Sequence, residues 1–143
     1  MALFNRNKQK LEETLAKLDA LEKRAKDLET DILTIGQSTA ILAMSPDGLI
    51  HSASERFLDM LGYTHEALVG QHHRILCDEQ YANSETYMKF WQALVIGQTQ
   101  QGRFTGLDSR GQAICLDACY APIMSEKRMV QRVIATISNV SWQ

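Results

Sequence analysis

The chain has 143 residues, of which 45% are hydrophobic and two are proline, so we expect a globular fold with room for one compact domain and an additional element. The formal net charge is −2 and no long basic run occurs, which argues against nucleic acid as a partner. No stretch approaches the ~20 apolar residues of a membrane span, and the start lacks a signal-peptide core, so the sequence predicts a soluble, cytoplasmic chain.

Residues 1–37 are predicted to form one long helix that pairs with a second copy of the chain. Small or apolar residues recur at alternating spacings of three and four, which is typical of the a and d positions of a coiled coil. The expected homodimer contacts are Leu11, Leu18, Leu21, Leu28, Ile32 and Ile35. Lys17 at a g position would face Glu22 at an e position of the partner helix, which favours a parallel pair. The alternative is an amphipathic helix that folds back on its own domain.

Residues 38–141 are predicted to form a separate domain whose sheet comes from both ends of the segment. The turn sequence SPDG separates two expected strands, 40–44 and 49–52. From Thr99 onward, alternating apolar residues and two turn sequences predict three more strands. All five strands are expected in one antiparallel sheet with helices on one face.

The helices are expected between the second and third strands. Ser52 or Ser54 should cap a short helix, Thr64 a second one, and Ser84 a longer helix that ends at Gly97. The buried stripe of that longer helix is predicted to be Tyr87, Phe90, Trp91 and Leu94.

This order of elements, with the sequence SPDGLIHSASERFLDMLGYTHEALVGQHHRILC, resembles a PAS sensor domain. The later sequences FWQALVIG and YAPI are similar to those in PAS domains of soluble bacterial chemoreceptors of the aerotaxis and biofilm-dispersal types. The resemblance implies an α+β fold, with a five-stranded antiparallel sheet, short helices on one face and a preceding coiled-coil helix. It also implies a dimeric, non-enzymatic input domain of a methyl-accepting receptor for energy, redox or oxygen taxis. The alternative is a PAS module that binds no ligand and serves assembly alone.

The same resemblance implies a signalling domain beyond the last strand, which this chain does not include. Relatives carry an acidic residue at the junction to their output helix, whereas this chain has Ser138-Asn139-Val140-Ser141 there. The coupling salt bridge of those relatives is therefore not expected in the same form.

The sequence GQHHRILC raises the question of a cofactor. In one class of haem-binding PAS domains the axial histidine comes from this segment, so the resemblance makes haem b a candidate, with His73 as its iron ligand. The expected cofactor-binding residues are His73, His72, Trp91 and Leu116. The alternative reading is that His73 hydrogen-bonds within the fold and Cys77 packs as a small apolar residue.

Flavin and metal sites are disfavoured by the residues present. The positions at which FAD-binding relatives have Asn, Trp and Asn are here Ser54, Gln100 and Gly106. His73 stands where light-sensing relatives have their photoreactive cysteine, which excludes that photochemistry. His73 and Cys77 are two ligands, where a structural zinc site needs four. Any other ligand would be an unidentified small molecule.

Overall fold

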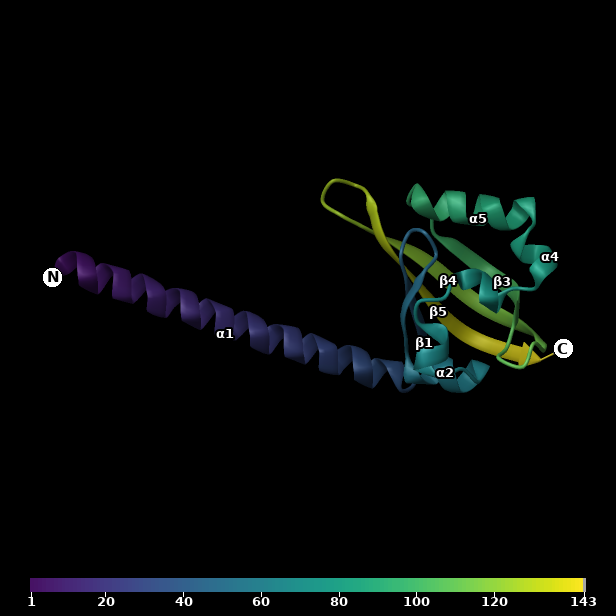
Figure 1. Ribbon diagram of the computed structural model, residues 1–143, viewed down its shortest axis with the longest axis horizontal. Helices are drawn as coiled ribbons and strands as arrows, with labels where there is room; N and C mark the ends of the chain where they lie inside the picture. The colour runs from purple at the N-terminus through teal and green to yellow at the C-terminus, as the bar shows by residue number, and fades with distance from the viewer. Residues whose placement is uncertain (143) are drawn as a thin grey trace. The chain divides into compact units, whose positions relative to one another are not determined.

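The computed structural model describes residues 1–142, which divide into two compact units between Ile35 and Gly36. The first unit contains all of helix α1, Ala2–Gly36, except its last residue (Figure 1). The side chains at its predicted a and d positions are exposed, with Leu21 and Ile32 each 63% accessible. Thr14, a polar residue in that stripe, satisfies its hydroxyl within the helix by donating to the Lys10 carbonyl at 2.9 Å. Among residues 1–142, no helix has both the length and the apolarity to cross a bilayer.

The second unit contains five strands and five short helical segments. The strands are β1 (Ala40–Met44), β2 (Ile50–Ala53), β3 (Gln100–Leu107), β4 (Ala113–Met124) and β5 (Val130–Trp142). The helical segments are α2 (Glu55–Leu61), α3 (His65–Leu68), the 3₁₀ turn η1 (His73–Leu76), α4 (Glu79–Ala82) and α5 (Glu85–Val95).

The strands form one antiparallel sheet in the order β2-β1-β5-β4-β3, which confirms the predicted five-stranded architecture. The first and last parts of the domain meet at its centre, where Leu42 of β1 pairs with Ala135 of β5. On the other side of β5, Ala135 pairs with Tyr120 of β4. A change in β4 therefore reaches β1 across a single strand.

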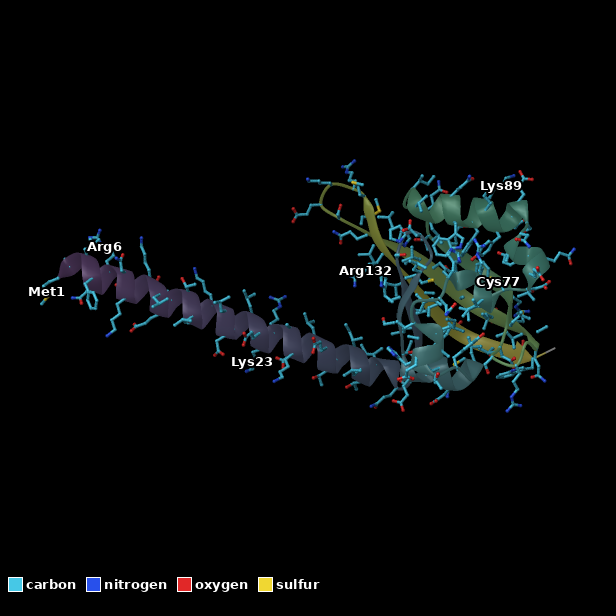
Figure 2. All side chains as sticks on the ribbon, in the orientation of Figure 1. Met1, Arg6, Lys23, Cys77, Lys89 and Arg132 are labelled. Atoms are coloured by element: carbon cyan, nitrogen blue, oxygen red, sulfur yellow. The ribbon has the colours of Figure 1, made fainter. Side chains whose placement is uncertain are left out.

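The core lies on one face of this sheet. Side chains of β4 alternate between buried and half-exposed, and the buried set includes Ile114, Leu116 and Tyr120. Figure 2 shows side chains gathered between α5 and the strands. Phe90 and Leu94 are the α5 residues that are buried there along with Tyr87.

Local sequence explains where these elements begin and end, with one departure from the prediction at the start of β2. Ser54, and not Ser52, caps α2, because its hydroxyl accepts the Phe57 N–H and also links to the backbone of β1. β2 begins at Ile50, one residue later than expected, because Leu49 forms an isolated bridge with His72. Ser84 caps α5 as predicted.

Candidate functional site

His72 forms the corner between the β1–β2 turn and η1. Its Nδ1 accepts the backbone N–H of Arg74 at 3.0 Å, so the ring caps the 3₁₀ turn. The ring also packs on Gly48, where a Cβ atom would lie 2.6 Å from Nε2. Gly48 has a φ of +88°, so this close approach and this turn both require glycine. Burial lowers the pKa of His72, which favours the neutral ring.

His73 is buried and joins three elements through its two ring nitrogens. Nδ1 lies 2.9 Å from the hydroxyl of Tyr87 on α5, and Nε2 lies 2.9 Å from the hydroxyl of Tyr120 on β4. We refer to this arrangement as the Tyr87–His73–Tyr120 chain. It connects η1 and α5 of the helical layer to the middle of the sheet.

The groups of this chain are electrically neutral. Burial, with a smaller effect from His72, lowers the pKa of His73 to about 3. Burial raises the pKa of both tyrosine hydroxyls above their usual range. A neutral imidazole has one N–H and one lone pair, so His73 donates to one hydroxyl and accepts from the other.

Cys77 packs beside this chain as a protonated thiol. Its Sγ lies 3.8 Å from Nδ1 of His73, and burial raises the pKa of the thiol to about 12. A neutral, buried thiol is a small apolar packing group with a weak donor and is not a reactive thiolate.

Aromatic rings fill the interior around His73. Its ring stacks on that of Tyr87 with centroids 5.8 Å apart and meets the Trp91 ring edge-on at 5.6 Å. Phe90 and Phe104 continue the cluster toward the sheet, with centroids 5.5 Å apart. The remaining interior cavity measures about 20 Å³, which is room for about one water molecule.

This interior does not fit a haem or a flavin as it stands. Both ring nitrogens of His73 already have tyrosine partners, so the one lone pair of the neutral ring is occupied and is not free for iron. Leu116 lines the same small cavity from the sheet side. Haem ligation by His73 remains a prediction, and it requires loss of one tyrosine hydrogen bond and displacement of several rings.

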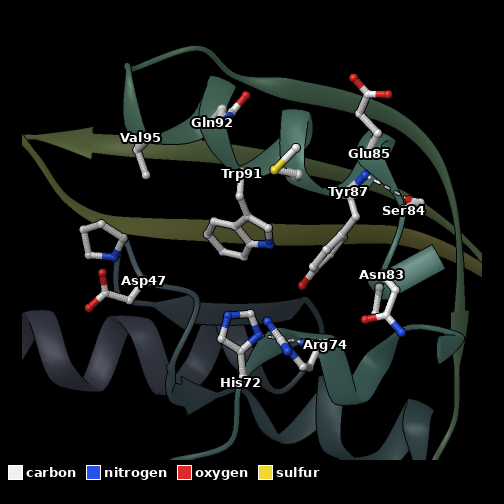
Figure 3. Close-up of a pocket in the computed structure, with 13 residues that line it drawn as sticks. Asp47, His72, Arg74, Asn83, Ser84, Glu85, Tyr87, Trp91, Gln92 and Val95 are labelled. Atoms are coloured by element: carbon white, nitrogen blue, oxygen red, sulfur yellow. Dashed lines mark hydrogen bonds between the residues drawn. The ribbon is translucent and has the colours of Figure 1, made fainter. Parts of the chain in front are cut away.

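A larger groove of about 770 Å³ opens on the outer side of this cluster (Figure 3). Trp91 and Tyr87 of α5 form one wall, and His72 and Arg74 form the opposite wall. The other lining residues come from the β1–β2 turn, from the end of α4 and the residues after it, and from α5: Pro46, Asp47, Ala82, Asn83, Ser84, Glu85, Met88, Gln92 and Val95.

Trp91 was expected on the buried stripe of α5 and is instead half-exposed in this groove. Its ring lies 6.2 Å from that of His72 across the groove. Its indole N–H is covered and faces the Tyr87 hydroxyl without reaching hydrogen-bonding geometry, so Nε1 has no partner. It is the one buried side-chain nitrogen or oxygen in residues 1–142 in that condition.

The open face of the sheet carries the other chemically active side chains. Arg103 on β3 pairs with Asp117 on β4 at 3.0 Å, and this ion pair lowers the pKa of the carboxyl. Cys115 and Cys119 flank Asp117 on the same half-exposed face and are free thiols. Within the described part of the chain, no three His, Cys, Asp or Glu side chains come close enough to hold a metal ion.

The structure therefore gathers the four predicted site residues around one aromatic cluster: His72 and Trp91 line the groove, and His73 and Leu116 line the small interior cavity. Sequence reasoning missed the role of Tyr87 and Tyr120. Tyr87 was expected on the buried stripe of α5, and a buried hydroxyl needs a hydrogen-bond partner. That requirement was the available signal, since His73 was the other polar residue expected inside.

The fold and the sequence together define the class of protein. Residues 38–141 match the model of the PAS domain family, so the chain belongs to that family. In Pseudomonas aeruginosa, the biofilm dispersion protein BdlA is 35% identical over 106 residues, which are 74% of this chain and 25% of BdlA. The chain thus spans about a quarter of the length of this relative.

Solved structures share the fold at low sequence identity. The light-state dimer of the fungal blue-light photoreceptor Vivid is similar with a TM-score of 0.61 at 19% identity, over 71% of this chain and 78% of that one. A Rhodobacter sphaeroides LOV protein is similar with a TM-score of 0.61 at 16% identity, over 70% of this chain and 58% of that one. A domain of a Geobacter sulfurreducens sensory box sensor histidine kinase/response regulator has a TM-score of 0.59 at 12% identity, over 71% of this chain and 82% of that one.

Proposed function

We propose that this chain is the sensory input module of a cytoplasmic chemotaxis-type receptor and that it passes the state of a bound ligand to dimeric coiled coils. The observation that carries the proposal is the Tyr87–His73–Tyr120 chain, because it joins a groove-lining helix to the central strands. The similarity to BdlA supports a role in signalling of this kind.

The route of the signal follows hydrogen bonds and strand pairs. Tyr87 lines the groove, and His73 links it to Tyr120 on β4. Tyr120 pairs with Ala135 on β5, which pairs with Leu42 on β1. β1 follows α1 closely in the chain, so a shift of β1 is passed to the segment that leads into the helix.

The dimeric part of this proposal is assigned to α1. Exposed leucine and isoleucine side chains form a stripe along α1 at heptad spacing. Burial of this stripe against a second helix would remove its apolar surface from water, which favours a coiled coil. The proposed homodimer contacts are Leu11, Leu18, Leu21, Leu28, Ile32 and Ile35. The coil would hold two sensory domains side by side and carry their movement along its axis.

An exchange experiment tests the sensory role. Residues 38–141 of this chain replace the similar segment of BdlA in P. aeruginosa, and biofilm dispersal is measured. We expect the chimaera to restore dispersal and Tyr120→Phe to abolish its response while the protein still accumulates. Thr105→Ala, on the open face of β3, is the matched control and should leave the response intact. An inactive chimaera that is folded, or a fully active Tyr120→Phe chimaera, would contradict the proposal.

A second candidate function is assembly without a ligand, and the filled interior around His73 favours it. Native mass spectrometry and a visible absorption spectrum of the purified chain separate the two candidates. A bound small molecule, or a Soret band that is lost in His73→Ala, supports the sensory role. A colourless protein whose mass is that of the dimer without any bound small molecule supports the assembly role.

In neither case do we assign an enzymatic activity, because the buried, neutral His73 is not an accessible base.

A further inference from the structure

We propose that the groove between α5 and η1 binds a small carboxylate ligand with a flat aromatic body. This inference rests on the proposed sensory function and names the chemical class of the signal. The groove lies outside the filled interior, and it combines a free cation with an aromatic wall. Its volume of about 770 Å³ is within the range of small-molecule sites, roughly 300–1,000 Å³.

The cation is Arg74. Its side chain is exposed on the wall formed by η1, and it forms no ion pair within residues 1–142. An unpaired guanidinium offers two parallel N–H donors, whose geometry matches one carboxylate. Of the acidic groups on the groove, Glu85 is paired with Lys89 at 3.4 Å. Asp47 lies beyond His72, at the end of the groove away from Asn83 (Figure 3). Arg74 is therefore left for a ligand.

The aromatic wall is Trp91. The planes of the Trp91 and His72 rings are tilted at 57° with centroids 6.2 Å apart, which leaves no gap for a ring between them, so a flat ligand would lie against the half-exposed surface of Trp91 that lines the groove (Figure 3). Ala82 and Val95 add apolar surface along the same groove. Aromatic rings stack favourably on such surfaces.

The indole N–H of Trp91 faces the Tyr87 hydroxyl without forming a hydrogen bond to it, so this donor on the groove wall is poorly satisfied. It is buried and has no partner, which is unfavourable for a polar group out of water. Because Tyr87 is adjacent on the same wall, the occupied groove acts directly on the Tyr87–His73–Tyr120 chain.

The two tryptophans of the chain allow a direct test with ¹⁵N-labelled protein. Only Trp91 and Trp142 give indole N–H resonances, and Trp142 is the internal reference because it donates to Asp108 at 3.2 Å. Naphthalene-2-carboxylate is the probe, and naphthalene-2-carboxamide is its neutral match. We expect the carboxylate to shift the Trp91 resonance with saturation, to leave Trp142 in place, and to bind at least tenfold more tightly than the carboxamide.

Arg74→Gln should weaken the binding of the carboxylate at least tenfold. Arg56→Gln, which changes an exposed arginine on α2, should leave the affinity for the carboxylate unchanged. No saturable shift of Trp91 would overturn the inference, and so would equal binding of carboxylate and carboxamide or an Arg74→Gln variant with unchanged affinity. If the probe binds as expected and the BdlA chimaera is inactive, the sensory role fails and the ligand class stands. If the chimaera is active without probe binding, the ligand class fails alone.

Discussion

His73 ties the stability of the sensory domain to pH. Its pKa in the folded protein is about 3, against about 6.5 for an unburied histidine, so the unfolded chain binds more protons between these values. The contribution of His73 to stability is therefore fully present above pH 6.5 and is lost as the pH falls toward 3. We expect a loss of about 2 kcal/mol from this residue between pH 7.5 and pH 5, measured by urea denaturation.

A comparison of variants isolates this effect from other acid-sensitive groups. His73→Phe cannot titrate, so its free energy of unfolding should fall less between the two pH values, although it starts lower because two tyrosine hydroxyls lose their partner. Gln101→Ala, at an exposed residue on β3 that carries no titratable group, should retain the wild-type pH dependence. Equal pH dependence of His73→Phe and wild type would show that His73 is not buried as described.

Gly106 shows how a single missing side chain sets the width of the interior. A Cβ atom there would lie 2.8 Å from the backbone carbonyl of Leu76, so η1 can approach β3 only because this strand residue is glycine. We expect Gly106→Ala to reduce the free energy of unfolding by about 1–3 kcal/mol, measured by chemical denaturation. Thr105→Ala, its exposed neighbour, is the control and should change stability by less. An unchanged Gly106→Ala protein would mean that η1 can move away freely.

At the same scale, sequence reasoning named His73 as a cofactor-binding residue or as a hydrogen-bonded residue of the fold, but it could not supply its partners. Tyr120 lies 47 positions beyond His73 in the chain, and Tyr87 lies 14 beyond it. Such contacts depend on how α5 crosses the sheet, and no local pattern encodes that crossing. The position of Trp91 was missed for a related reason. Helical spacing gives the apolar face of α5, but only the packed structure shows which edge of that face stays open.

At the scale of a single element, α1 allows a prediction about dimerisation of the chain. Leu21 lies in the exposed apolar stripe, and a charge there would be buried at the proposed seam, whereas Lys23 lies on the opposite side of the heptad. We expect Leu21→Asp to convert a dimer to a monomer in sedimentation velocity at micromolar concentration. Lys23→Asp, which introduces the same carboxylate with an even larger change in charge, should remain dimeric. A dimeric Leu21→Asp protein would place the dimer contact elsewhere.

Elements whose boundaries depend on neighbouring residues were predicted well from sequence. Thr64 and Ser84 cap their helices as expected, since a cap involves residues two or three positions apart. The start of β2 was one residue off because the bridge between Leu49 and His72 joins segments distant in sequence. The division into residues 1–37 and 38–141 stays a prediction.

At the scale of the whole sensory domain, Asp108 connects the β3–β4 hairpin to the last strand. Its carboxylate accepts the N–H groups of Arg110 and Gln112 at 2.9 Å each, and it also accepts the indole N–H of Trp142. The N–H of the next residue, Ser109, donates to the carbonyl of Leu61 at the end of α2. One turn thus holds together a hairpin, a helix and the end of β5.

We expect Asp108→Ala to loosen this region as a unit. Amide hydrogen exchange should rise in the hairpin and near the end of β5 and should stay unchanged in β1, measured by mass spectrometry of peptides. Asp59→Ala, at an exposed carboxylate on α2, is the control and should leave exchange in both regions as in wild type. Faster exchange confined to the hairpin would show that the bond to Trp142 does not hold β5.

The Tyr87–His73–Tyr120 chain has two proton arrangements on one set of heavy atoms. In one arrangement the hydrogen sits on Nδ1, so the sheet presents Tyr120 as a donor; in the other it sits on Nε2, and Tyr120 is an acceptor. The two differ in the polarity of the bonds and not in the position of any carbon, nitrogen or oxygen. A change at Tyr87 can therefore reverse the dipole that β4 experiences before any strand moves. The ¹⁵N shifts of His73 would record that reversal, while the backbone would look the same in both states.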